Sequence, residues 1–157
     1  MEVKELGHVV LYVRDVELSA RFYRDVLGWR QILPAPGSAP NPREWRAAMF
    51  NAPSGRTHHE LLLIEVGADA AGHPEGKRIG LYHFGLKIGT SDDELRAARD
   101  ELTKSGTTIL GASDHYATHS LYIADPDGNE IELYVDVPGI DWEAPEAIGA
   151  QTKPLYL

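Results

Sequence analysis

Apolar residues recur along the chain with the spacings of strands and helices, and the same series of elements occurs twice. In the first half, apolar and β-branched residues predict a strand over residues 6–13, and helical spacing predicts a helix over residues 15–27. In the second half, the corresponding predictions are a strand over residues 81–88 and a helix that starts within residues 90–94 and ends at Gly106.

Three further strands are expected after each predicted helix, separated by turns rich in proline, glycine and aspartate. They cover residues 29–33, 45–51 and 58–66 in the first half, and residues 107–111, 120–124 and 129–135 in the second. Residues 34–42 are expected to form a longer loop, and residues 125–128 a tight turn. The order is therefore βαβββ, repeated once.

A shift of 75 positions, the separation of His8 and His83, brings the two halves into register. Leu11 then meets Leu86, and other matches follow in the predicted helices. We predict an α+β fold made of two βαβββ modules. The expected bounds are residues 1–67 for the first module, 68–80 for a linker, 81–136 for the second module and 137–157 for a C-terminal tail.

Side chains alternate between the two faces of a strand, and three of the predicted strands have one wholly apolar face. The opposite faces carry His8, His83 and Glu132. Ionisable groups in the middle of strands are costly without a purpose. The plain alternative is two hydrogen-bonded histidines and a solvent-exposed glutamate, but the matching repeat positions of the histidines favour a shared role. We therefore predict that these three residues bind one divalent metal ion.

The predicted ligand set also limits the choice of metal. Two histidines and one carboxylate leave coordination positions open, which suits a non-haem Fe(II) centre that uses oxygen. Mn(II), Ni(II) or Zn(II) would also accept these ligands. The chain has no cysteine, so thiolate metal sites and disulfides are excluded.

The composition is that of a folded, acidic protein. Of 157 residues, 43% are hydrophobic, and 15 Lys and Arg against 24 Asp and Glu give a formal charge of −9. This acidity argues against a nucleic-acid partner and against an anionic membrane surface. Because the first residues lack the apolar core of a signal peptide and no stretch approaches a membrane span, we expect a soluble, cytoplasmic protein.

Two motifs resemble the vicinal oxygen chelate superfamily, which includes glyoxalases, bleomycin-resistance proteins and extradiol dioxygenases. The opening motif is GHVV at residues 7–10 with RFYRDVLGW at residues 21–29, and the closing motif is DPDGNEIELY at residues 125–134. Together they cover nearly the whole chain. The resemblance implies paired βαβββ modules that form an incomplete barrel around a metal, with Glu132 as the carboxylate ligand.

The segment HHELLLI at residues 58–64 separates two branches of this superfamily. If the chain resembles glyoxalase I, Glu60 faces the metal as a fourth ligand. If it resembles the extradiol dioxygenases, His59 faces the site as the catalytic acid and base. Because the side-chain period of a strand is two, both cannot face inward unless a bulge intervenes.

Two further residues favour the dioxygenase branch, closest to catechol 2,3-dioxygenase-like proteins. Tyr122, ten residues before Glu132, resembles the family's substrate-binding tyrosine, and His115 resembles its second histidine beside the substrate. We therefore expect Fe(II)-dependent extradiol cleavage of a catecholic aromatic substrate by O2, as in aromatic catabolism. A glyoxalase I-like lyase using Ni(II) or Zn(II), and a metal-free aromatic- or drug-binding protein, stay open. A homodimer is expected because small modules leave strand edges to cover.

Overall fold

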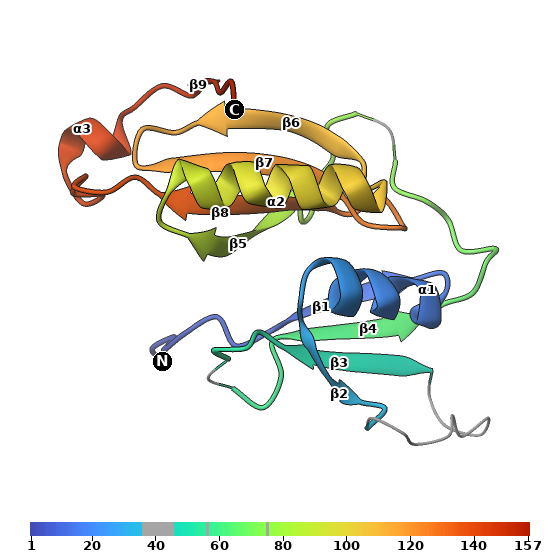
Figure 1. Ribbon diagram of the computed structural model, residues 1–157. Helices are drawn as coiled ribbons and strands as arrows, with labels where there is room; N and C mark the ends of the chain where they lie inside the picture. The colour runs from blue at the N-terminus through green and yellow to red at the C-terminus, as the bar shows by residue number, and fades with distance from the viewer. Residues whose placement is uncertain (36–45, 56, 75) are drawn as a thin grey trace. The chain divides into compact units, whose positions relative to one another are not determined.

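The computed structural model describes residues 1–35, 46–55, 57–74 and 76–157. Two compact units make up the chain, Met1–His73 and Pro74–Leu157, and the division falls inside the segment 68–80 that was expected to be a linker (Figure 1). Most of the expected loop at residues 34–42, and Trp45 at the start of an expected strand, lie outside the described residues.

The first unit has the predicted order of elements around an open four-stranded sheet. Strands run in the order β1-β4-β3-β2, with β1 parallel to β4 and the other neighbours antiparallel. The elements are β1 (Val9–Val13), α1 (Val16–Arg21), a short π-helix η1 (Phe22–Val26), β2 (Arg30–Leu33), β3 (Ala47–Asn51) and β4 (Leu61–Glu65).

The helix α1 begins where a polar side chain satisfies its first amides. The Asp15 carboxylate accepts hydrogen bonds from the backbone N–H groups of Glu17 and Leu18, at 2.9 and 3.0 Å. Ala20 and Tyr23 are buried, as their helical spacing predicted. The apolar face of the helix thus covers one side of the sheet and fixes which side of β1 points away from it.

The second unit repeats this plan and adds two elements. Its open sheet has the order β5-β8-β7-β6-β9, and β5 is parallel to β8. The elements are β5 (His83–Gly89), α2 (Asp92–Ser105), β6 (Ile109–Asp114), β7 (Thr118–Ala124), β8 (Glu130–Asp136), α3 (Pro145–Ile148) and β9 (Lys153–Pro154). The predicted α+β class with two βαβββ modules is confirmed.

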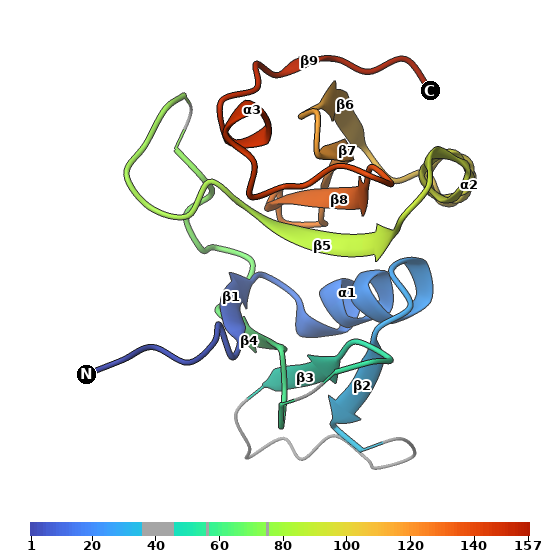
Figure 2. The same ribbon diagram turned by 90° about the vertical axis from the view of Figure 1, so that its left-hand side faces the viewer.

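The core of the second unit lies between α2 and one face of its sheet (Figures 1 and 2). Ser91 caps the start of α2, and Gly106, with a φ of 74°, ends it in the left-handed conformation that favours glycine. Alternate residues of β8 are fully buried under this helix: Ile131, Leu133 and Val135. The other face of β8 therefore carries Glu132 and its neighbours two residues away.

The bounds of several expected strands are corrected; the strand expected over residues 58–66, for example, is β4 at Leu61–Glu65, so His59 and Glu60 precede it. The strand expected over residues 6–13 starts only at Val9, because the pairing of β1 with β4 begins with Val9 opposite Leu61. His8 therefore precedes its strand and His83 opens β5, so only Glu132 lies in the middle of a strand. In the tail, α3 and β9 were not predicted. Among the described residues, no helix is both long enough and apolar enough to cross a membrane.

Candidate functional site

Three histidines gather at one end of the sheet in the first unit. The ring centroid of His59 lies 4.6 Å from that of His8 and 4.4 Å from that of His58, and the Nδ1 atoms of His58 and His59 are 2.6 Å apart. The parallel pairing of β1 and β4 brings them together, since the N–H of Val9 donates to the carbonyl of Glu60 at 2.9 Å. Residues that immediately precede each strand are therefore neighbours.

His59 has the features of a reactive side chain. Its Nε2 is buried and has no hydrogen-bond partner among the described residues. Buried polar atoms are nearly always paired, so an unpaired one indicates a place for a ligand or a proton donor. Burial lowers the pKa of His59, and the nearby His58 and His8 lower it further by charge repulsion. The neutral imidazole is thus favoured.

Glu60 has a different environment from His59. Its Oε2 accepts a hydrogen bond from the backbone N–H of Ala52 at 2.8 Å. A Cβ added to Gly55 would lie only 2.6 Å from the same oxygen, so the turn between β3 and β4 closes tightly around the carboxylate. In the first unit, Glu60 therefore holds this turn, whereas His59 lies against His8.

In the second unit, His83 and Glu132 face each other from neighbouring strands. The pairing of β5 with β8 sets Gly85 opposite Glu132, and the Nε2 of His83 lies 3.3 Å from the Oε2 of Glu132. The Nδ1 of His83 lies 3.4 Å from Oε1 of Glu130, yet it is buried and makes no hydrogen bond with the described residues, because the approach is poorly aligned. The pair presents one nitrogen and one oxygen side by side.

The second oxygen of Glu132 is held by two hydroxyl groups. Its Oε1 accepts hydrogen bonds from the Oγ of Ser120 at 2.6 Å and from the hydroxyl of Tyr122 at 3.2 Å. Ser120 is completely buried. With Oε1 occupied, Oε2 is the oxygen that faces His83. Ser120 was not predicted from the sequence, although the two-residue period of β7 places it on the same face as Tyr122.

His115 extends this hydrogen-bond chain. Its Nε2 lies 2.7 Å from the hydroxyl of Tyr122, and its Nδ1 lies 3.1 Å from the hydroxyl of Thr152 in the tail. Burial, followed by the charge and hydrogen bond of Glu132, raises the pKa of Tyr122 to about 12. Tyr122 thus stays protonated and acts as a donor. The structure brings four of the predicted residues, His83, His115, Tyr122 and Glu132, into one cluster.

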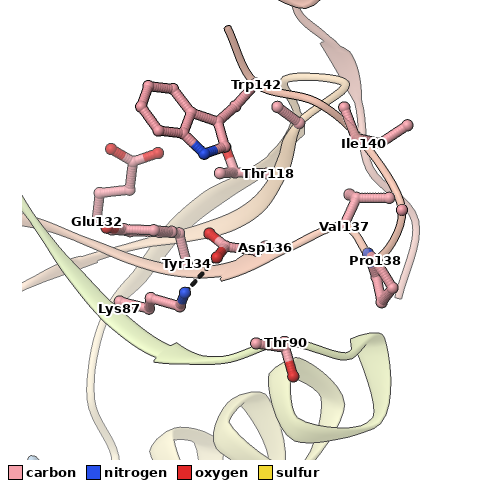
Figure 3. A pocket seen from close by; sticks show the side chains of 12 residues that line it. Lys87, Thr90, Thr118, Glu132, Tyr134, Asp136, Val137, Pro138, Ile140 and Trp142 are labelled. Atoms are coloured by element: carbon pink, nitrogen blue, oxygen red, sulfur yellow. Dashed lines mark hydrogen bonds and ion pairs between the residues drawn. The ribbon is translucent and has the colours of Figure 1, made fainter.

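A pocket of about 760 Å³ adjoins this cluster on the same face of the sheet. Glu132 lines it together with Lys87 from β5, Thr118 from β7 and Trp142 from the segment after β8 (Figure 3). Neither Lys87 nor Trp142 was predicted from the sequence to be a site residue. Both residues line the pocket because of the way the strands and the segment after β8 pack together, which is not a local property of the sequence.

The donors of the second unit suit a divalent ion. A nitrogen and an oxygen 3.3 Å apart are spaced for two ligands of one ion, whose bonds are about 2.0–2.2 Å long. Gly85 leaves space beside them, since a Cβ there would lie 3.6 Å from the Oε2 of Glu132. In the described part of the chain, however, no group of three or more His, Asp or Glu side chains could hold a metal. The ligand set His8, His83 and Glu132 draws on both units and stays a prediction.

Several characterised proteins are similar to this chain. Catechol-2,3-dioxygenase of Bacillus subtilis (strain 168) is 34% identical over 142 residues, which are 90% of this chain and 45% of that protein. An iron-dependent extradiol dioxygenase of Rhodococcus jostii (strain RHA1) is 32% identical over 137 residues, 82% of this chain and 42% of that protein. The chain therefore spans less than half the length of these two relatives.

A third relative belongs to the other branch. Lactoylglutathione lyase of Haemophilus influenzae (strain ATCC 51907 / DSM 11121 / KW20 / Rd) is 28% identical over 136 residues, 82% of this chain and 90% of that protein. The relatives thus include both enzyme classes that were left open from the sequence, dioxygenases and a lyase.

Solved structures and a family model agree on the fold. A glyoxylase/bleomycin resistance protein/dioxygenase domain from Frankia sp. EAN1pec superposes with a TM-score of 0.68 at 21% identity, over 86% of this chain and 99% of that one. At this identity the likeness shows the fold alone. The model of the glyoxalase/bleomycin resistance protein/dioxygenase superfamily matches residues 5–133, which include the opening motif and the closing motif as far as Leu133. The chain therefore belongs to this superfamily, also called the vicinal oxygen chelate superfamily.

Proposed function

We propose that this protein is an Fe(II)-dependent extradiol dioxygenase that opens the ring of a catecholic substrate with O2. The observation that carries the proposal is the contrast between two adjacent residues. His59, whose buried Nε2 has no hydrogen-bond partner in the described part of the chain, lies against the predicted ligand His8. The Glu60 carboxylate is instead hydrogen-bonded to the turn between β3 and β4. The two dioxygenase relatives support the same branch.

Three residues would hold the metal in this proposal: His8, His83 and Glu132. When bound, Fe(II) would supply open positions at which the diol and O2 are held together. The name of the Rhodococcus relative supports iron, while Mn(II), Ni(II) and Zn(II) would fit the same donors. Ser120 and Tyr122 would keep the Oε2 of Glu132 directed at the ion by occupying its other oxygen.

His59 would be the catalytic acid and base. Its free Nε2 would accept a proton from a catechol hydroxyl and return it to an oxygen of the opened product, so that no net proton is lost. Tyr122, which stays protonated, has one O–H proton; when substrate binds, it would donate that proton in a hydrogen bond to a substrate oxygen instead of to Glu132, while Ser120 keeps its hydrogen bond to Oε1. His115 would orient the tyrosine hydroxyl through the 2.7 Å contact.

The second candidate is a glyoxalase-like lyase in which Glu60 is a fourth ligand to Ni(II) or Zn(II). The lyase relative from Haemophilus influenzae, matched over 90% of its length, favours it. This candidate requires Glu60 to leave its hydrogen bond with Ala52. A non-catalytic aromatic-binding protein would need neither His59 nor a metal.

Activity of matched variants tests the proposal. We would reconstitute the protein with Fe(II) without oxygen, add substituted catechols and O2, and record oxygen uptake and the yellow ring-opened product. Loss of a general acid–base group typically costs about 10²–10⁴-fold in rate, and we expect His59→Ala to lose kcat by that order. Glu60→Gln, which keeps an oxygen for the Ala52 N–H, is the control and should retain ring cleavage.

The other outcomes point to the other candidates. Absence of oxygen uptake, combined with Ni(II)-dependent conversion of a hemithioacetal that disappears in Glu60→Gln, would move the protein to the glyoxalase branch. Tight binding of catechols with no turnover under either condition would make it a binding protein.

A further inference from the structure

The pocket beside Glu132 is larger than one aromatic ring requires. Its volume is about 760 Å³, within the range of about 300–1,000 Å³ that is usual for sites of drug-sized ligands. It lies between the polar face of the sheet in the second unit and the segment that follows β8 (Figure 3). A catechol whose diol is held near Glu132 therefore leaves room for a bulky ring substituent.

The wall formed by the segment after β8 is apolar. Val137, Pro138, Ile140 and Trp142 line the pocket, and the indole of Trp142 is 69% exposed. A large aromatic side chain exposed at a pocket is suited to stacking on a second ring or packing against an alkyl group, which stabilises by burial and by ring–ring contact. This wall provides no cation for an anionic substituent.

The charged residues of the pocket are likewise unsuited to an anionic substituent. Among its described lining residues the charged ones are Lys87, Glu132 and Asp136, which sum to one negative charge. The Nζ of Lys87 donates a hydrogen bond to the Oδ2 of Asp136, so its charge is already neutralised. Asp136 lies four residues beyond Glu132 on β8, about 13 Å along the strand, and both side chains line the pocket. A carboxylate that enters the pocket would therefore meet a net negative charge and, among the described lining residues, no free cation.

We infer that this pocket selects catechols with an uncharged, apolar substituent, of the aryl or alkyl class, over catechols with a carboxylate. This substrate class rests on the proposed dioxygenase function. The net negative charge disfavours the anionic compounds because Lys87 is paired with Asp136, and the wall of Ile140 and Trp142 binds the apolar ones.

Competing substrates test the selectivity. We would compare kcat/KM for 3-phenylcatechol and 3,4-dihydroxyphenylacetate by oxygen uptake, and we expect the phenyl compound to be favoured at least tenfold. Asp136→Asn frees Lys87 and should move the ratio of the two kcat/KM values at least fivefold toward the carboxylate. Lys87→Gln, which removes the cation, is the matched control and should move the ratio in the opposite direction. Equal kcat/KM values, or a preference for the carboxylate in the wild type, would overturn the inference while the proposed dioxygenase activity stands.

Binding to metal-free protein separates the two proposals. The fluorescence of Trp142 would report binding of 3-phenylcatechol, with Trp142→Phe identifying its contribution among the three tryptophans. We expect quenching by 3-phenylcatechol at concentrations at least tenfold lower than by 3,4-dihydroxyphenylacetate. If this difference appears but no compound is cleaved, the inferred class holds and the proposed reaction fails. If neither compound quenches Trp142, the pocket is not the substrate site.

Discussion

Among single residues, the buried Ser120 donates a hydrogen bond to Glu132 that we expect to affect metal affinity. Residues that orient metal ligands typically change metal affinity about 10–100-fold when mutated. We expect Ser120→Ala to weaken binding of Zn(II) or Fe(II) by that order, because Oε1 then loses its shorter hydrogen bond and is left with the longer one from Tyr122. Competition with a coloured chelator measures the affinity.

The control for this prediction is Ser105→Ala, at the end of α2, where the lost hydroxyl bonds Leu102 and Thr107 and does not touch Glu132 in the described structure. Both variants should remain folded by circular dichroism. An affinity in Ser120→Ala equal to that of the control would show that Glu132 needs no such positioning.

At the scale of elements, the cap of α1 gives a pH-dependent prediction. Hydrogen bonds from the backbone N–H groups of Leu18 and Glu17 lower the pKa of the Asp15 carboxyl below its ordinary value of 3.8. A lowered folded-state pKa adds stability that is complete above the unfolded pKa and is lost as the pH falls through the folded pKa. Asp15→Ala should therefore reduce the free energy of unfolding by about 0.5–2 kcal/mol near neutral pH.

Chemical denaturation of wild type and Asp15→Ala at several pH values measures this effect. The stability difference should shrink below about pH 3.8, the ordinary pKa of the carboxyl. A difference that is independent of pH would mean that the charge of Asp15 contributes nothing to the cap. Asp15→Asn, which keeps a capping oxygen without the charge, should be intermediate near neutral pH.

The helices and strands also differ in how well a local sequence pattern predicts them. The helix α2 has a cap, an apolar stripe and a terminal glycine within one segment, and it was predicted almost to the residue. By contrast, α3 and β9 are four and two residues long, too short for a periodic signal. The strand β9 exists only because it pairs with β6, through Ser113 opposite Pro154.

At the scale of the whole molecule, the open edges of both sheets bear on assembly. In the described sheets, β1 and β5 each pair with one strand only, so each has a free edge. Exposed edges tend to be covered by other chains or elements. We expect a homodimer, and analytical ultracentrifugation of the full chain at micromolar concentration measures it. A sedimentation mass of 17.3 kDa at all concentrations would contradict this expectation.

Local patterns in the chain were sufficient to predict the repeated βαβββ order, the buried faces of α2 and β8, and the candidate site residues, because periodicity and capping depend on neighbouring residues. They were not sufficient to predict the environments of His59 and Glu60, since strand alternation leaves both registers open. These environments depend on tertiary contacts: the pairing of β1 with β4 and the turn that closes on Glu60. The tertiary structure likewise placed Ser120 against Glu132 and Trp142 beside a pocket, because such contacts depend on which strands become neighbours.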